Sequence, residues 1–303
     1  MKLTTVDLYK SFGDKPVLNG ISLCAQGGKA LGLLGRNGAG KTTTIRIIMQ
    51  VFSADSGQVL LDGEPLDTDK VKIGYLPEER GLYPKKEIMP QLIYFGQLAG
   101  LTKKEARDRA LKLLDKLQVA EYAGKRLETL SKGNAQKIQL IATLIADPDI
   151  VILDEPFSGL DPVNAMLLKD IIKETIADGK IVLFSSHQMN YIEEFCDEIA
   201  ILNGGRIVLS GSIKDIKHEY AKNEIDIEAD DADSVLDYIR TIHADRLVSS
   251  EIRDGTIHLK LGKETDKAFI FSSLSQFANE IKAFGDHVPT LNEIFVKFTE
   301  DRI

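Results

Sequence analysis

The chain has 303 residues, of which 43% are hydrophobic and 28% are charged, and its net charge is −8. This length exceeds what a single hydrophobic core usually organises, so we expect two domains. The acidic balance argues against a protein that coats nucleic acid, because such a protein needs many lysines and arginines to displace counterions. We therefore expect no nucleic-acid partner.

The sequence contains no apolar run close to the roughly 20 residues that span a bilayer. Its first residues, MKLTTVDLYKSF, lack the apolar region of a signal peptide, so we expect a cytosolic protein. Cys24 and Cys196 lie far apart in apolar surroundings, and we interpret them as buried, reduced thiols with a structural role.

A strand–loop–helix pattern surrounds the segment GRNGAGKT, which matches G-x-x-x-x-G-K-[ST]. Glycines let backbone N–H groups turn toward an anion, Lys41 is placed to reach terminal phosphates, and Thr42 offers a hydroxyl to Mg²⁺. The preceding KALGLLG predicts a buried strand, and the following TTTIRIIMQ predicts a helix whose N-terminus faces the phosphates. The predicted nucleotide-binding loop comprises Gly35, Arg36, Asn37, Gly38, Ala39, Gly40, Lys41, Thr42 and Thr43. The loop alone leaves ATP and GTP undecided.

Two carboxylates follow the apolar run of residues 150–153 in DIVILDEP, which is typical of a strand buried on both faces. Asp154 suits the role of the aspartate that holds Mg²⁺ in phosphate-loop nucleoside triphosphatases. Glu155 is placed to act as a base that orients water on the γ-phosphate. The alternative for such a pair is a plain solvated turn, which the phosphate loop upstream disfavours.

The segment LETLSKGNAQKIQLIATLIADPDIVILDEPFSGLDP resembles the signature sequence, second acidic motif and D-loop of the ATP-binding cassette (ABC) ATPases, in that family's order. The resemblance covers residues 2–215. It implies an α/β phosphate-loop fold with a mixed sheet, a helical subdomain at about 87–145, and ATPase activity with ATP and Mg²⁺. We place the nucleotide-binding domain at 1–220 and an accessory α+β domain at 221–303.

The resemblance assigns three further contacts to the nucleotide. Phe12 resembles the aromatic residue that stacks on adenine, with Val17 as its apolar neighbour, although Phe12 also fits a core residue at a strand end. His187 follows the predicted strand KIVLFSSH and resembles the switch histidine that contacts the γ-phosphate. Together with Lys41 and Glu155, His187 completes the predicted catalytic set.

A second ATPase subunit is also implied. Ser131 and Gly133 resemble the signature serine and glycine, with Ser131 as the N-cap of the helix SKGNAQKIQLIATLIA. In the family this helix faces the γ-phosphate bound by a second subunit, so that two chains enclose two ATP molecules. Asp161 resembles the D-loop residue that links the two sites. Whether the dimer is homomeric or heteromeric stays open.

The sequence departs from the family pattern at two places. Glu78 stands where the family has a glutamine in its Q-loop, and we expect its carboxylate to contact Mg²⁺ or a bound water. The signature reads Ser-Lys-Gly-Asn instead of Ser-Gly-Gly-Gln, and Lys132 either adds charge near phosphate or points to solvent. Neither change removes the catalytic groups, so we expect an active ATPase.

Residues 87–128 read as helical. TKKEARDRALKLLDKLQV begins with a capping box from Thr102 to Glu105. One apolar face is predicted from Ala106, Ala110, Leu113, Leu114 and Leu117. In the family a groove beside this subdomain receives a helix of a membrane subunit. The residues in the matching stretch line that groove or belong to the subdomain core: Tyr83, Ile88, Leu92, Tyr94 and Phe95.

The last ninety residues predict a small α+β domain. We expect a strand in NEIDIEADDAD, a helix in DSVLDYIRTI, a hairpin at Asp254-Gly255, a helix over AFIFSSLSQFANEI, a strand in IKAFGDHV and a capped helix in PTLNEIFVKFTEDR. The acidic run reads as a solvated face. His258 and His287 are isolated in the sequence, and we expect neither to be a ligand.

By resemblance to the sodium and drug export type, we expect an ATP-hydrolysing subunit of an exporter. Since the chain has no span, it would act with a separate transmembrane permease at the cytoplasmic face of the membrane. One alternative is a soluble ABC ATPase acting on ribosomes or DNA, which usually has two cassettes or a coiled-coil insertion. The other is a nucleotide-gated binding module, which the retained Glu155 and His187 disfavour.

Overall fold

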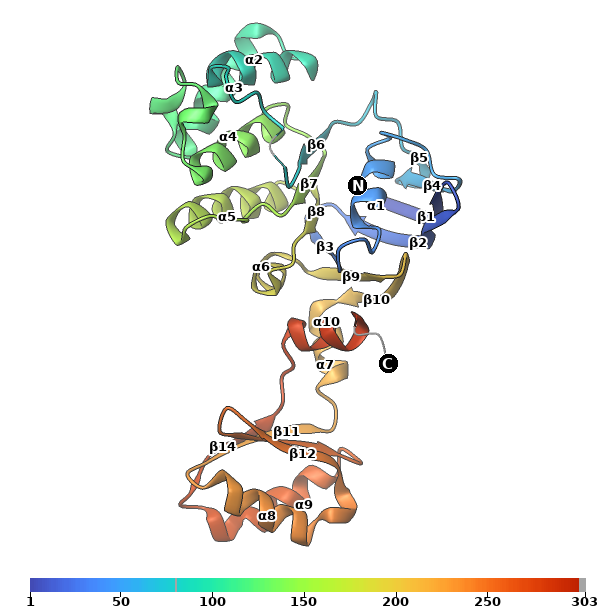
Figure 1. Ribbon diagram of the computed structural model, residues 1–303, viewed down its shortest axis with the longest axis vertical. Helices are drawn as coiled ribbons and strands as arrows, with labels where there is room; N and C mark the ends of the chain where they lie inside the picture. The colour runs from blue at the N-terminus through green and yellow to red at the C-terminus, as the bar shows by residue number, and fades with distance from the viewer. Residues whose placement is uncertain (80, 300–303) are drawn as a thin grey trace. The chain divides into compact units, whose positions relative to one another are not determined.

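The structure is a computed structural model that describes residues 1–79 and 81–299, in two compact units (Figure 1). The first unit comprises residues 1–213 and the C-terminal segment from residue 295, and the second comprises residues 214–294. Each unit has its own buried apolar cluster. Within the described ranges, none of the helices combines the length and apolar character needed to cross a membrane.

The first unit contains two sheets. An antiparallel sheet has the strand order β2-β1-β4-β5, and a mixed sheet has the order β10-β9-β3-β8-β7-β6. In the mixed sheet the neighbouring strands are parallel except for β9 and β10. The strands are β1 (Lys2–Phe12), β2 (Lys15–Gln26), β3 (Ala30–Gly35), β4 (Ser56–Leu61), β5 (Glu64–Pro65), β6 (Ile73–Leu76), β7 (Ile150–Asp154), β8 (Ile181–Ser185), β9 (Glu198–Asn203) and β10 (Arg206–Ser212).

The core of this unit fixes the helix that follows the phosphate loop. Helix α1 (Lys41–Ile48) contributes buried Ile45 to a cluster that also holds Leu3 of the antiparallel sheet and Leu33 and Ile152 of the mixed sheet. Burial of such side chains contributes about 1.5–3 kcal/mol each. The loop between β3 and α1 is therefore held at both ends by packed elements, and the predicted strand–loop–helix pattern is confirmed.

Helices α2, α3 and α4 form a helical subdomain, and α5 and α6 lie against the mixed sheet (Figure 1). The predicted capping box is present, since Glu105 N donates to Thr102 Oγ1 at 3.2 Å and Thr102 N donates to Glu105 Oε2 at 2.8 Å. The helical elements are α2 (Ile88–Leu98), α3 (Lys103–Lys116), η1 (Ala120–Tyr122), η2 (Leu127–Thr129), α4 (Lys132–Leu144), α5 (Pro162–Ala177) and α6 (Met189–Phe195).

Burial separates the residues that the sequence left between groove and core. Ile88 and Leu92 are fully buried and belong to the subdomain core, whereas Tyr83 and Tyr94 are exposed. The predicted apolar face of α3 is buried except at Leu113, which is half-buried. Cys196 is buried, and its burial raises the pKa of the thiol, but Cys24 is only half-buried, so the expectation of two buried thiols is wrong for Cys24.

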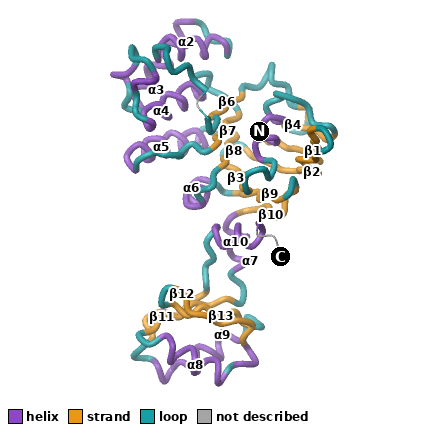
Figure 2. Tube along the Cα trace, viewed as in Figure 1, coloured by secondary structure: helices purple, strands orange, loops and turns teal. Residues whose placement is uncertain are grey.

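The second unit is an antiparallel sheet in the order β12-β13-β11-β14, with α8 and α9 on one face (Figure 2). The predicted hairpin is confirmed, with Asp254 and Gly255 both at positive φ. The elements of this region are α7 (Ile213–Tyr220), β11 (Glu224–Ala229), α8 (Ala232–Ile242), η3 (Ala244–Arg246), β12 (Leu247–Arg253), β13 (Thr256–Leu261), α9 (Asp266–Ser273), η4 (Leu274–Phe277), β14 (Ile281–Asp286) and α10 (Leu291–Thr299).

Two predictions for this region differ from the structure. The helix expected over AFIFSSLSQFANEI ends at Ser273, where the hydroxyl groups of Ser272 and Ser273 donate to backbone carbonyls of the preceding turn and a 3₁₀ turn follows. His258 and His287 are not isolated, because antiparallel pairing brings both to Asp226. The capping box of α10 is present at Thr290 and Glu293, but the predicted end of that helix lies outside the described residues.

Candidate nucleotide site

A pocket of about 730 Å³ opens where β3, β7 and β8 end. Ligands of α/β sheets bind at this carboxyl edge, because the loops that follow parallel strands meet there. Most of the predicted site residues line the pocket. Its lining consists of Val17, Gly35, Arg36, Asn37, Gly38, Gly40, Lys41, Thr42, Thr43, Glu78, Asp154, Glu155, His187 and Phe295.

The backbone of the loop requires glycine at its last turn. Gly40 has φ +112°, and a Cβ atom there would lie 2.6 Å from Leu18 Cδ2. Gly38 also has positive φ, at +81°. Side chains would strain both positions, so the bare backbone can approach a phosphate group closely. Ala39 belongs to the same loop but is buried against the core and does not line the pocket.

Lys41 is held across the loop that precedes it. Its Nζ donates to Gly35 O at 2.6 Å, and burial lowers the pKa of its ammonium group, although Asp154, Glu155 and Glu78 oppose that shift. The ammonium group therefore faces three carboxylates across the pocket. Thr42, the next residue, is exposed at the start of α1 and lines the pocket.

Asp154 ends β7 with a buried side chain. Tyr75 on the neighbouring strand β6 donates its hydroxyl to Asp154 Oδ2 at 3.5 Å. Burial, followed by the charge of Asp154, raises the pKa of Tyr75 to about 12. The phenol therefore stays protonated at neutral pH and supports the carboxylate from outside the pocket.

Glu155 is held by the two residues that follow β8. Its Oε2 accepts from Ser186 Oγ at 3.0 Å, and its Oε1 accepts from the backbone N of His187 at 2.7 Å. The His187 Nδ1 atom also lies 2.7 Å from Oε1. The Glu155 side chain is 8% exposed and the His187 ring is 72% exposed. An ionised carboxylate only accepts, so Nδ1 carries the proton and Nε2 is left for another group.

The backbone of Glu155 adopts a strained conformation. Its φ is +50°, in the left-handed region that few residues other than glycine adopt. Its backbone N donates to Ser185 O at 2.9 Å, which ties the turn to β8. Such strain costs of order 1–3 kcal/mol and persists only where the surroundings enforce it.

Phe12 lies outside this pocket in the described structure. Phe12 is 51% exposed at the end of β1, and its ring packs edge-on against Phe52 with 5.6 Å between centroids. This exposure contradicts the alternative of a buried core residue. Val17 lines the pocket directly.

The signature residues also lie away from the pocket of their own chain. Ser131 caps α4 by accepting from Asn134 N at 3.3 Å, which confirms the predicted N-cap. Gly133 packs against α5, since a Cβ there would lie 2.8 Å from Asn164 Nδ2. Asp161 accepts from Asn164 N at 3.0 Å and caps the same helix. The signature helix and the D-loop are thus joined through Asn164.

Lys132 takes a path that the sequence did not specify. Its aliphatic chain lies over Gly159, so closely that a Cβ at that glycine would overlap the Lys132 side chain. Lys132 remains exposed to solvent. The substitution in the signature is therefore accommodated by a glycine of the D-loop.

Three residues at this site were not predicted from the sequence. Tyr75 and Ser186 support the two carboxylates, and Phe295 of α10 lines the pocket. Ser186 directly precedes His187, so its position after a strand offered a usable signal. Tyr75 and Phe295 reach the site only through strand pairing and through the return of the C-terminal helix.

Comparison with known proteins agrees with this geometry. The ABC transporter family model matches residues 18–158, and a model of the C-terminal domain of DrrA1-3-like ATP-binding proteins matches residues 211–299. An uncharacterised ABC transporter ATP-binding protein of Bacillus subtilis (strain 168), YhaQ, is 40% identical over 296 residues, with 97% of each chain covered. This chain belongs to the ABC transporter ATP-binding proteins.

Other relatives extend the same picture. The Nod factor export ATP-binding protein I of Burkholderia lata is 33% identical over 210 residues, which cover 68% of this chain and 69% of that one. The solved ATP-binding subunit of an ABC transporter superposes with a TM-score of 0.65 at 29% identity, covering 73% of this chain and 93% of that one. The ABC cassette fold, ATP binding and ATPase class of this chain follow from these matches.

Proposed function

We propose that this ABC ATPase powers an exporter: two ATPase subunits enclose two Mg–ATP at the cytoplasmic face of the membrane and drive a separate permease. The observation that carries the catalytic part is the arrangement around Glu155, beside Lys41 and Asp154. Export rests on similarity to the Nod factor export protein.

The residues of the pocket fit a magnesium-bound triphosphate. Gly38 has open space where a Cβ would stand, and the positive φ at Gly40 turns the loop, so the bare backbone can approach a phosphate group. Thr42 supplies a hydroxyl, and Asp154 and Glu78 supply carboxylates, which are the oxygen ligands that Mg²⁺ prefers. When bound, Mg²⁺ neutralises phosphate charge during transfer.

Glu155 has one acceptor position left for a water molecule. A carboxylate offers about four lone-pair sites, and three are taken by Ser186 Oγ, His187 N and His187 Nδ1. We assign the remaining site to the attacking water. Glu155 accepts its proton as the water oxygen bonds to the γ-phosphorus and the bond from the γ-phosphorus to the β–γ bridging oxygen breaks, so that ADP leaves with the pair of electrons of that bond. Lys41 holds the phosphate, and the exposed Nε2 of His187 contacts the γ-phosphate.

The domain boundary and the dimer contacts are part of the same proposal. We keep the predicted domain order, a cassette at 1–220 and an accessory domain at 221–303, although the compact units divide after residue 213 and the segment from residue 295 belongs to the first unit. Ser131, Gly133 and Asp161 lie away from the pocket of their own chain, as residues that serve a second subunit's ATP would. We place Phe12 against the adenine, because its ring is exposed at a strand end.

A groove in the helical subdomain supports the permease contact. It encloses about 320 Å³ between β6, α2 and α4, and its apolar lining includes Leu82, Phe95 and Leu98. An apolar groove beside the Q-loop segment suits a short helix of a membrane subunit. Phe95, predicted from the sequence, lies in it, whereas Ile88 and Leu92 do not.

The test uses tagged Glu155→Gln in its native cell, with membranes solubilised in mild detergent and Mg–ATP. A multi-span membrane protein recovered in stoichiometric amount, together with a dimer of ATPase subunits, is expected. Lys41→Ala is the matched control and should lose the dimer. Recovery of ribosomal or DNA-repair proteins, or of the ATPase alone, would contradict the permease partner.

A further inference from the structure

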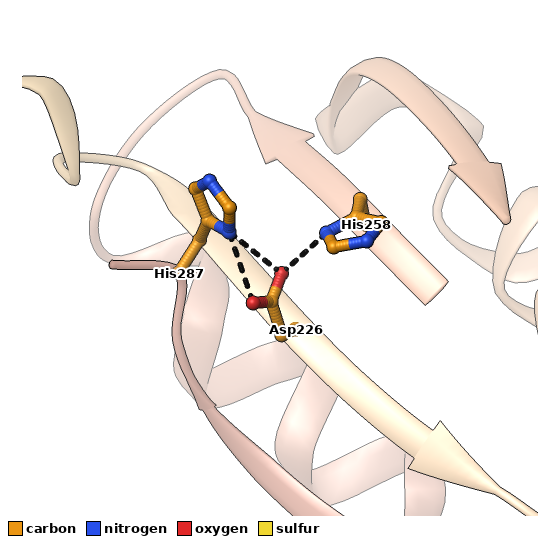
Figure 3. A group of neighbouring side chains, drawn as sticks. All are labelled: Asp226, His258 and His287. Carbon is orange, nitrogen blue, oxygen red and sulfur yellow. Dashed lines mark hydrogen bonds and ion pairs between the residues drawn. The ribbon is translucent and has the colours of Figure 1, made fainter. Parts of the chain in front are cut away.

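Three side chains of the second unit converge on its exposed sheet face. His258 Nδ1 lies 2.7 Å from Asp226 Oδ1, and His287 Nδ1 lies 2.9 Å from Oδ2 and 3.1 Å from Oδ1. Figure 3 shows both imidazole rings directed at the one carboxylate. These residues come from β11, from β13 and from the position after β14, so only the folded sheet brings them together.

Strand pairing fixes this cluster. Asp226 on β11 lies directly opposite His258 on β13, and the backbone N of His287 donates to Glu224 O at 3.0 Å. Ile225 and Ile227 point into the buried core, so alternation turns Asp226 to the other face of the sheet. The donor atoms are therefore positioned by the backbone before any ligand arrives.

The lysine and arginine side chains near the cluster pair with other carboxylates, so the Asp226 carboxylate is paired with the two imidazole rings. Lys260 pairs with Glu224 at 3.1 Å, and Arg253 pairs with Glu251. Within residues 1–79 and 81–299, the ion pairs of Asp226 are those with the two histidines. The side chains of Asp226, His258 and His287 are 31%, 23% and 14% exposed, at a polar pocket of about 170 Å³.

The outer nitrogen of His287 also faces a carboxylate. Its Nε2 lies 3.8 Å from Glu293 Oε2, and Glu293 is held in place by the backbone N of Thr290 at 2.7 Å. A metal-binding histidine commonly directs its second ring nitrogen at a carboxylate, which fixes the tautomer that leaves the other nitrogen free to coordinate. At 3.8 Å this contact is longer than a hydrogen bond, and a small shift of either side chain would let Glu293 do this for His287.

We propose that Asp226, His258 and His287 bind a divalent transition metal ion of the zinc class, independently of the nucleotide site. Their donor atoms, two imidazole nitrogens and one carboxylate oxygen, lie within 4.8 Å of one another. Tetrahedral Zn²⁺ with ligands at about 2.0–2.2 Å would separate the donor atoms by about 3.3–3.6 Å, so small shifts suffice. On binding, each Nδ1 proton moves to Nε2 through solvent, and two hydrogen bonds are replaced by two coordinate bonds. Water completes the tetrahedron on the open side.

The test is a titration of the full chain, nucleotide-free and stripped of metal by chelation, with Co²⁺ followed by its visible d–d absorption. We expect saturation at one ion per chain, with displacement by Zn²⁺. His258→Ala and His287→Ala should each weaken binding at least about tenfold. His218→Ala is the matched control, since His218 is exposed on α7 outside the cluster, and it should bind as the wild type does.

Asp226→Asn guards against loss of folding, because the amide keeps the shape of the side chain and still accepts a hydrogen bond. It should retain the wild-type circular dichroism spectrum and lose the Co²⁺ spectrum. The proposed site would be overturned if Asp226→Asn bound Co²⁺ as tightly as the wild type does. It would also be overturned if His258→Ala and His287→Ala kept wild-type Co²⁺ affinity, or if His218→Ala lost as much Co²⁺ affinity as they do. ATP binding is unaffected by any of these outcomes, so the two proposals fail separately.

Discussion

The two units each pair an imidazole with a carboxylate at 2.7 Å, but they bury opposite partners. In the cassette the carboxylate of Glu155 is buried and the ring of His187 is open to the pocket. In the second unit Asp226 is the most exposed member, and two partly covered rings share it. The buried carboxylate of Glu155, held by hydrogen bonds, suits a general base, and its exposed partner His187 can reach the nucleotide. The carboxylate of Asp226, shared by two imidazole rings, suits three side chains that bind one metal ion together.

The strand arrangement explains this difference. Glu155 and His187 follow neighbouring parallel strands, whose carboxyl ends deliver loops to one edge. Asp226 and His258 lie in the middle of antiparallel strands, where cross-strand neighbours meet face to face. A loop edge can accept a large mobile substrate, and a sheet face fixes atoms at short separations.

The largest effect that tests the cassette side of this comparison is expected for Glu155→Gln. Loss of the base should lower ATP turnover by about 10²- to 10⁴-fold while ATP still binds. Phosphate release and nucleotide affinity measure the two quantities, with Glu121→Gln, an exposed position outside the pocket, as the control. Normal turnover in Glu155→Gln would remove the base assignment.

The second effect concerns the accessory unit. Zn²⁺ at about one hundred times its dissociation constant should stabilise the folded state by about 2.7 kcal/mol. Hydrogen exchange read by mass spectrometry should show slower exchange in β11 and β13 with Zn²⁺ and around residues 35–43 with ATP. Protection of residues 35–43 by Zn²⁺ without nucleotide would place the ion in the wrong unit.

A smaller loss is expected for His187→Ala, because the ring positions Glu155 and contacts phosphate without taking the proton. Turnover should fall about tenfold, equivalent to ~1.4 kcal/mol. Single-turnover kinetics at saturating ATP separate this from weakened binding. A loss of turnover as large as that of Glu155→Gln would mean that the imidazole itself is the base. The histidine of the cassette would then act directly, as the histidines of the second unit are proposed to do.

The smallest effect is expected from removing the Asp231 cap of helix α8. This change tests whether metal affinity merely follows the stability of the folded unit. Asp231 accepts from Ser234 at the start of α8, and these hydrogen bonds lower the pKa of its carboxyl below the ordinary 3.8. Its contribution to stability is therefore present above pH 3.8 and is lost as pH falls through the lower folded pKa.

Asp231→Ala should accordingly unfold at slightly lower temperature than the wild type at neutral pH, with the difference vanishing in acid. Thermal unfolding monitored by circular dichroism at several pH values measures this. Co²⁺ affinity should not change, since Asp231 lies outside the cluster. A parallel loss of Co²⁺ affinity would show that the cluster responds to folding alone.

The nucleotide site of the cassette could be predicted because its functional residues lie in short contiguous segments of the sequence. Lys41 and Thr42 stand together, Asp154 and Glu155 stand together, and glycine spacing together with the flanking strand and helix identifies the loop. Capping boxes at Thr102 and Thr290 and the turn at Asp254 were equally legible, since each depends on residues at most three positions apart. These features express local backbone preferences, which short segments carry by themselves.

The rest needed strand pairing and packing. Burial chose between groove and core for Ile88 and Leu92, and the return of the C-terminal segment brought Phe295 to the pocket. The separations between Asp226, His258 and His287 in the sequence carry no period that marks a site, so the histidines looked isolated. Their meeting depends on the register of β11 with β13 and β14, and register is set by which face the isoleucines bury, a property of the whole sheet.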